Sequence, residues 1–106
     1  MYYAFIVNPT AGTGFAAVTM KKREAVLQAR GVEYRVFHTE KPGHGTEIAA
    51  RLAGEEDILA VVSVGGDGTA GEVAAGLSGT GKAMGIIPAG TGNDFIKSAG
   101  DRKSVV

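Results

Sequence analysis

Residues 58–64 form an almost unbroken apolar run, and this run leads directly into the glycine turn Gly65-Gly66-Asp67-Gly68-Thr69. An apolar run without polar alternation is typical of a central parallel strand that is covered on both faces. Parallel strands need crossover connections, usually helical, so this segment points to an α/β fold. The turn leaves backbone N–H groups without side-chain cover at the carboxyl end of the strand, an arrangement that suits phosphate groups.

The remaining segments alternate between strand and helix, as a parallel sheet requires. The sequence predicts strands over residues 3–7, 32–37, 58–64 and 83–87, and helices over residues 15–30, 46–52, 70–77 and 93–99. Gly31 stands at the expected C-cap of the first helix, and Thr46 can cap the second. The predicted class is α/β with a parallel sheet.

The first predicted helix carries apolar residues at roughly helical spacing, which is typical of an amphipathic helix. These residues are Phe15, Val18, Met20, Ala25, Val26 and Ala29. The charged residues 21–24 are expected on its solvated face.

Length and charge limit the classes of protein to which the chain can belong. Its 106 residues suffice for one domain with a modest core, and its 11 basic and 11 acidic residues balance. No block of like charge is long enough for a nucleic-acid footprint, so nucleic-acid binding is disfavoured. The chain has no cysteine for a disulfide and no apolar run of the ~20 residues that a membrane span needs. We therefore expect a soluble, cytoplasmic domain.

Two familiar phosphate-binding patterns occur in the chain but fit it poorly. Residues 76–83 nearly spell a P-loop, yet Ala83 has no hydroxyl for magnesium and the segment lies between a helix and a strand. Residues 66–71 and 12–17 match the dinucleotide fingerprint. Residues 66–71 lack the acidic residue expected about 20 positions later. Glu40 could be the acidic residue for residues 12–17, but the loop there is longer than the usual tight turn. An ordinary dinucleotide site is therefore disfavoured.

Loops follow the predicted strands at residues 8–14, 39–45, 65–69 and 88–92. Because the carboxyl ends of parallel strands meet at one edge of a sheet, these four loops are expected to share a ligand crevice. Asp67 places a carboxylate among bare amides, where it can meet a metal ion or an attacking hydroxyl. The alternative is a turn aspartate that bonds to its own backbone.

The combination of these motifs is more specific than any one of them. They are Asn8-Pro9, Thr39, Gly65-Gly66-Asp67-Gly68-Thr69 and Pro88-Ala89-Gly90-Thr91-Gly92-Asn93-Asp94-Phe95. In this order they resemble the N-terminal nucleotide-binding (catalytic) domain of the diacylglycerol kinase and sphingosine kinase superfamily, particularly its bacterial lipid kinases. The resemblance extends over nearly the whole chain and implies a three-layer, Rossmann-like α/β domain with a parallel sheet. NAD kinases resemble this group in fold and share the glycine core, whereas residues 90–95 resemble lipid kinases.

The resemblance implies that ATP, with Mg²⁺, binds across the strand ends. It further implies that the γ-phosphoryl group passes to the hydroxyl of a lipid such as diacylglycerol, with peripheral contact at a membrane surface. It assigns nucleotide binding to Asn8, Pro9, Thr10, Ala11, Gly12, Thr39, Gly65, Gly66, Asp67, Gly68, Thr69 and Thr91, and catalysis to Asp67. It assigns neither the magnesium ligands nor an oligomeric state.

The chain departs from the family pattern in two respects. Ala70 and Gly71 stand where leucine and asparagine are common, so any contact of that asparagine is not made. The second, mostly β domain of the superfamily does not fit within 106 residues, so residues 1–106 are expected to be a nucleotide-binding domain that is inactive alone. Two alternatives stay open: an NAD kinase-like enzyme and a noncatalytic nucleotide-binding module.

Other polar residues receive simpler interpretations. His44 is expected to be an exposed loop residue, and two histidines without an acidic cluster predict no metal site. Asn93 and Asp94 are expected to cap the last predicted helix.

Overall fold

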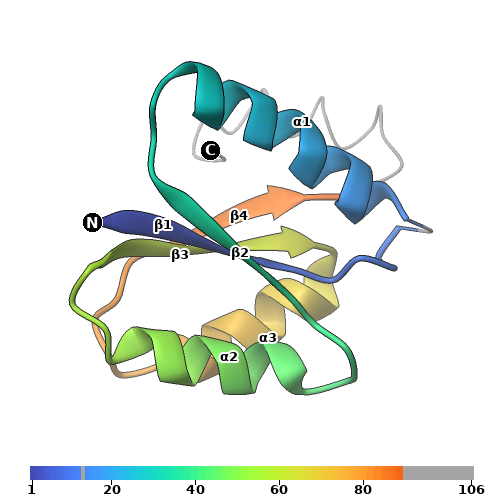
Figure 1. Cartoon of the computed structure of the whole chain (residues 1–106). Coiled ribbons are helices and arrows are strands. Elements are labelled where there is room, and N and C mark those ends of the chain that lie inside the picture. Colours follow the sequence, from blue (N-terminus) through green and yellow to red (C-terminus); the bar gives the residue numbers. More distant parts are fainter. Residues whose placement is uncertain (13, 90–106) are drawn as a thin grey trace, which may run out of the picture.

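The structure is a computed structural model, and it describes residues 1–12 and 14–89. In this part of the chain, four parallel strands form one sheet. β1 (Tyr2–Val7) and β3 (Ile58–Gly65) lie at the centre, and β2 (Tyr34–His38) and β4 (Met84–Pro88) lie at the edges, in the order β2-β1-β3-β4. α1 (Phe15–Ala29) covers one face, and α2 (His44–Ala53) and α3 (Asp67–Leu77) cover the other (Figure 1). The predicted three-layer α/β fold with a parallel sheet is confirmed.

The carboxyl ends of the strands are level with one another. The ladder continues one bond past the strand ends, through Asn8 N–H to Val64 O (3.2 Å), Thr39 N–H to Val7 O (2.9 Å) and Ala89 N–H to Gly65 O (2.9 Å). The loops that follow the strands therefore start side by side at one edge of the sheet.

The direction of chain connection reverses between β1 and β3. The chain leaves β1 through α1 on one face to reach β2, and it leaves β3 through α3 on the opposite face to reach β4 (Figure 1). The loops that follow β1 and β3 therefore run to opposite faces of the sheet. In doubly wound sheets, ligands bind in the crevice between two such loops.

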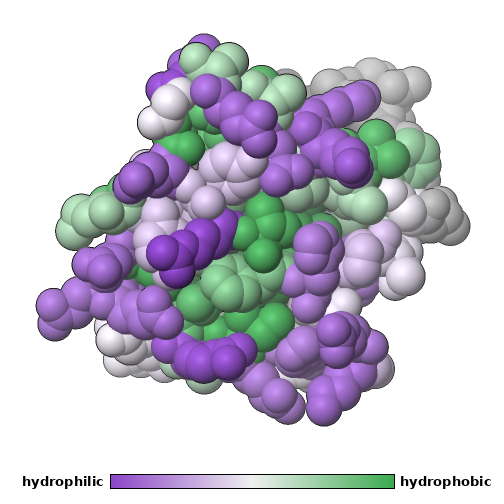
Figure 2. Space-filling model, viewed as in Figure 1, coloured by the Kyte–Doolittle hydropathy of each residue, from purple (hydrophilic) through white to green (hydrophobic). Residues whose placement is uncertain are grey.

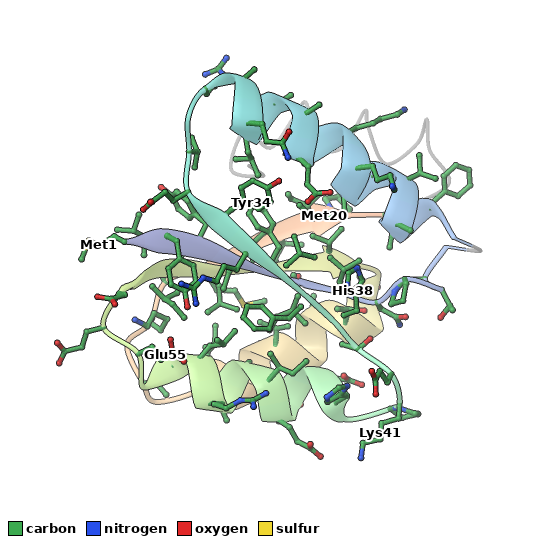
Figure 3. All side chains as sticks on the ribbon, viewed as in Figure 1. Met1, Met20, Tyr34, His38, Lys41 and Glu55 are labelled. Atoms are coloured by element: carbon green, nitrogen blue, oxygen red, sulfur yellow. The ribbon has the colours of Figure 1, made fainter. Side chains whose placement is uncertain are left out.

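Apolar clusters fill the space on both sides of the sheet. Ile6, Ile48 and Val73 belong to the cluster beneath α2 and α3, and none of them is more than 3% exposed. On the other face, Met20 of α1 is buried and Tyr34 of β2 packs against the same cluster (Figure 3). Because the side chains of β3 alternate between the two clusters, its sequence is apolar almost without interruption.

The predicted apolar stripe of α1 is largely wrong. Phe15, Val18 and Val26 are 43%, 49% and 50% exposed, and Ala25 and Ala29 are exposed as well. The residues that pack on the sheet are Ala16, Met20 and Leu27. They share one helical face, whereas most of the predicted stripe points elsewhere. The end of α1 is as predicted: Gly31 has φ +70°, and Val32 N–H donates to Leu27 O at 3.0 Å, as in a Schellman motif.

Both later helices begin before their predicted starts. Gly43, in the left-handed conformation with φ 84°, is the N-cap of α2, so Thr46 lies inside the first turn and does not cap the helix. α3 begins at Asp67 rather than at residue 70, because extended Gly66 turns the chain directly from β3 into the helix. The predicted helix over residues 93–99, with its caps Asn93 and Asp94, lies outside the described residues.

Edge strand β2 is less covered than the central strands. Its five residues are all half-buried or exposed. Figure 2 shows hydrophobic surface along the middle of the face that β2 crosses, with hydrophilic surface on both sides of it. This edge of the core is therefore only partly shielded from water.

Candidate functional site

A cleft of about 370 Å³ opens at the carboxyl edge of the sheet. It is lined by Asn8, Pro9, Thr10, Thr39, Glu40, Lys41, Pro42, Gly68, Thr69 and Glu72. These residues come from the loop after β1, the loop after β2 and the first turns of α3. In Figure 3, Lys41 lies at the outer end of the loop that joins β2 to α2.

A second hollow of similar volume lies between α1 and the sheet. Its walls are mainly apolar and include Phe5, Val62 and Ile87. It contains none of the residues for which the sequence predicts a binding role. The cleft at the strand ends is therefore the candidate functional site.

The loop after β1 is held in a tight, defined conformation. The Asn8 side-chain oxygen accepts bonds from Thr10 N–H (3.2 Å) and Thr10 Oγ1 (3.0 Å), an Asx turn that keeps both residues at the cleft wall. Gly12 has φ +62°, and a Cβ added there would run into the Ala89 carbonyl oxygen. The backbone at Gly12 therefore lies close to the Ala89 carbonyl, just after β4.

The first turn of α3 presents unpaired amides at the cleft. Gly66, Asp67 and Gly68 are exposed, whereas Thr69 is only 5% exposed. No side chain caps the helix, and within residues 1–12 and 14–89 the N–H groups of Asp67, Gly68 and Thr69 have no acceptor. Such a terminus carries a partial positive charge and favours an anion. The Asp67 carboxylate stands at its start and does not bond to its own backbone.

The first turn of α2, by contrast, is closed by a side chain from α3. Glu72 Oε2 accepts from Gly43 N–H and Glu72 Oε1 accepts from Gly45 N–H, each at 3.0 Å. Thr46 Oγ1 donates to the Glu72 carbonyl oxygen at 2.8 Å. The acidic side chain therefore takes the position at this helix end that an external anion would need.

His44 is not the exposed loop residue that the sequence predicts. It is the first residue of α2 and is half-buried, and its Nδ1 accepts from Glu40 N–H at 2.9 Å. This bond fixes the loop after β2, so the imidazole has a structural partner.

The structure brings together most, but not all, of the predicted nucleotide-binding residues. Asn8, Pro9, Thr10, Thr39, Gly68 and Thr69 line the cleft. Gly66 and Asp67 are exposed immediately before Gly68, and Gly65 is buried with Thr69 packed against it. Ala11 and Gly12 continue the loop after β1 without lining the cleft, and Thr91 lies outside the described residues.

Four cleft residues have no predicted role: Glu40, Lys41, Pro42 and Glu72. The first three directly follow Thr39, in a loop that the strand order already placed at this edge. Glu72 lies four residues after Gly68, and this spacing puts both on one side of a helix. These two signals could have identified them.

Neither a metal cluster nor a membrane-spanning helix is found among the described residues. In residues 1–12 and 14–89, no three histidine, cysteine, aspartate or glutamate side chains are grouped so as to hold a metal ion. None of the helices in the same ranges is long and apolar enough to cross a bilayer.

The fold and the cleft define a class: a Rossmann-like α/β domain whose candidate site lies where the direction of chain connection reverses. Residues 2–105 match the diacylglycerol kinase catalytic domain family. Because this match spans nearly the whole chain, the chain belongs to the diacylglycerol kinase catalytic domain family. The resemblance drawn from the motifs is thereby confirmed.

Individual relatives carry corresponding names. The chain is 35% identical over 105 residues to the "Putative lipid kinase YtlR" of Bacillus subtilis, covering 96% of this chain and 34% of that protein. It is 38% identical over 92 residues to the diacylglycerol kinase of Staphylococcus saprophyticus, covering 85% of this chain and 30% of that one. Among solved structures, "A putative diacylglycerol kinase from Bacillus anthracis str. Sterne" matches with a TM-score of 0.74 and 30% identity, over 98% of this chain and 38% of that one. The chain thus spans about a third of the length of these relatives.

Proposed function

We propose that this domain binds Mg-ATP in the cleft and that Asp67 takes part in transfer of the γ-phosphoryl group to a lipid hydroxyl. The observation that carries the proposal is the first turn of α3, where three amides without an acceptor among the described residues stand beside one exposed carboxylate. Family membership supports a lipid kinase, and the helix end supports phosphate as the group that it receives.

The two helix ends beside the cleft support a particular orientation of the nucleotide. The end of α2 is closed by the Glu72 carboxylate, so the triphosphate is expected at the end of α3. Asn8 to Thr10 and the loop that follows Thr39 then form the walls for the rest of the nucleotide. The cleft volume falls within the range of about 300 to 1,000 Å³ that is common for ligand sites.

Asp67 suits phosphoryl transfer because this chemistry depends on alignment and charge more than on covalent help. Its carboxylate is exposed at the start of a helix, where it can accept the proton of the attacking hydroxyl or bind a cation. Mg²⁺, when bound, offsets the negative charge of the phosphates. Asp67 could contribute one ligand to this ion, and the described residues hold no group of three metal-binding side chains.

We further propose diacylglycerol or a related lipid as the acceptor, which the protein would reach by peripheral contact with a membrane. In the complete protein, a second, mostly β domain would supply much of the lipid site, so residues 1–106 alone would not catalyse the reaction. The share of the relatives that the chain spans supports this division.

The first test is a thermal-shift titration of the chain with Mg-ATP and, separately, with NAD. A ligand that binds only the folded state raises the melting temperature by mass action. Mg-ATP is expected to stabilise the chain, and Gly68→Val is expected to abolish the shift without lowering the melting temperature of the free protein by more than ~2 °C. Nothing lies within 4 Å of a Cβ at Gly68, so the new side chain covers the amides without a clash.

Gly71→Val is the matched control, because Gly71 lies in the same helix with open space around it but does not line the cleft. Its Mg-ATP shift should equal that of the unaltered chain. Selective stabilisation by NAD would instead favour an NAD kinase-like enzyme.

The second test is Asp67→Asn in the complete protein. Turnover of diacylglycerol with ATP is expected to be nearly abolished, while the melting temperature hardly changes because the side chain is exposed. Unchanged turnover would remove Asp67 from the mechanism.

A further inference from the structure

We propose that Glu72 is a positioning residue that locks the loop after β2 onto α3, so that two walls of the cleft hold a fixed separation. This inference rests on the proposed function only where it concerns the affinity for ATP. The lock itself follows from contacts that do not depend on any ligand.

Glu72 uses both carboxylate oxygens and its carbonyl oxygen to hold α2. The carboxylate accepts from Gly43 N–H and Gly45 N–H at 3.0 Å each, and the carbonyl accepts from Thr46 Oγ1 at 2.8 Å. One residue of α3 therefore makes three bonds to the first turn of α2. Bonds to an ionised acceptor are roughly twice as strong as neutral ones, so this contact is the strongest polar link that the described residues make between the two helices.

The backbone on the α2 side is shaped to receive a carboxylate. Gly43 has φ 84°, a conformation that turns its N–H toward α3 and that side chains disfavour. Gly45 is buried, and a Cβ added there would lie 2.8 Å from Glu72 Oε1 and 3.2 Å from Glu72 Cβ. A side chain at Gly45 would displace the carboxylate, and a side chain at Gly43 would strain the backbone that presents the N–H.

The lock connects directly to the walls of the cleft. Glu40, Lys41 and Pro42 line the cleft and precede Gly43, while Gly68 lies on the opposite wall one helical turn before Glu72. The bond from Glu40 N–H to His44 Nδ1 (2.9 Å) stiffens the short stretch between the lock and the cleft. When the hydrogen bonds of Glu72 are lost, the loop after β2 is expected to move away from the N-terminus of α3. The amides at the N-terminus of α2 are then expected to lose their acceptor.

Glu72→Gln removes the lock at nearly constant volume. Glutamine has one acceptor oxygen, so one of the two amides must face an NH₂ group and lose its bond. Glu72→Asp keeps the charge, but its side chain is one methylene shorter, so it too should fail to accept hydrogen bonds from both amides. Glu47→Gln is the matched control, because Glu47 is also an acidic residue in the first turn of α2 but is exposed.

The decisive readout is amide hydrogen exchange at Gly43 and Gly45, together with the dissociation constant of Mg-ATP at a temperature where all variants are folded. In Glu72→Gln, amide exchange is expected to rise about tenfold or more at the glycine whose N–H faces the NH₂ group, as for loss of one charged hydrogen bond. The dissociation constant of Mg-ATP is expected to rise about tenfold. Glu47→Gln should change neither. A purely structural role would lower the melting temperature but leave the affinity of the folded protein unchanged.

Unchanged exchange in both Glu72 variants would overturn the lock. Faster exchange with unchanged ATP affinity would overturn its positioning role. If the unaltered protein does not bind Mg-ATP at all, the proposed function and the effect on affinity both fail, whereas the exchange data still decide whether Glu72 holds the loop.

Discussion

Gly76→Ala is expected to destabilise the domain, while Gly71→Ala in the same helix is expected to stabilise it. Gly76 lies close to α2: an added Cβ would be 2.5 Å from the Thr46 carbonyl oxygen and 2.7 Å from Ala49 Cβ. A Cβ at Gly71 would have nothing within 4 Å. Neither glycine has a positive φ, so neither substitution strains the backbone.

The magnitudes follow from two opposing effects. Replacing glycine by alanine inside a helix stabilises by up to ~1 kcal/mol. At Gly71 this gain stands alone, so the melting temperature should rise by roughly 5 °C. At Gly76 the new methyl meets backbone atoms, which cannot rotate away, so α2 must shift at the upper end of the ~1–3 kcal/mol that overpacking costs. The net loss is then about 2 kcal/mol, or roughly 10 °C.

Urea denaturation followed by circular dichroism, with thermal melting alongside, measures both variants against the unaltered chain. If Gly76→Ala proves as stable as Gly71→Ala, α2 and α3 do not form a close, rigid contact at Gly76. Because Thr46 takes part in this contact and in the bond to Glu72, Gly76→Ala should also speed amide exchange at Gly45.

Two further perturbations test other parts of the structure. Gly12→Ala is expected to destabilise the domain by about 2–5 kcal/mol, because the ~1–2 kcal/mol cost of a positive φ adds to the ~1–3 kcal/mol cost of the clash with the Ala89 carbonyl. Gly14→Ala, with φ 96° and open space, should show only the cost of the φ angle. If urea melts show that Gly12→Ala and Gly14→Ala lower the free energy of unfolding equally, the loop after β1 does not contact the end of β4 as closely as expected. Burial and then the hydrogen bond to Glu55 raise the pKa of Tyr2, so the unfolded chain loses the Tyr2 proton near pH ~10 while the folded protein still holds it. The contribution of Tyr2 to the free energy of unfolding should therefore be full below pH ~10 and fall as the pH rises further. Urea melts at stepwise higher pH should show this extra loss of stability, and Tyr2→Phe should lack it. If the free energies of unfolding of the two proteins fall in parallel with pH, Tyr2 is not the group responsible.

The parts of the fold that were predictable are those set by nearby residues. The apolar run of β3 and the glycines that follow it need no knowledge of the rest of the chain, so the parallel sheet and the shared edge of the loops could be inferred from them. The C-terminal cap at Gly31 is equally local. Conformational limits on glycine and the needs of a buried strand act over only a few residues.

The parts that were missed depend on residues far apart in the chain. The inward face of α1 is Ala16, Met20 and Leu27 because the sheet surface decides which side packs, whereas the larger apolar side chains Phe15 and Val18 remain exposed. The bonds of Glu72 to α2 were missed because its partners Gly43 and Gly45 are 29 and 27 residues away. No spacing rule within one helix predicts such a bond.

The earlier start of α3 changes the argument about Asp67. In a loop, the carboxylate would share the freedom of the loop backbone, and its distance from a phosphate would vary. As the first residue of a helix whose third residue, Thr69, is only 5% exposed and packs against Gly65, Asp67 has a backbone fixed by the sheet behind it. Phosphoryl transfer depends on alignment, and a small misplacement of a catalytic group is costly. The short connection from β3 to α3 thus fixes the backbone of Asp67 beside amides that have no acceptor within residues 1–12 and 14–89, as the role proposed for its carboxylate requires.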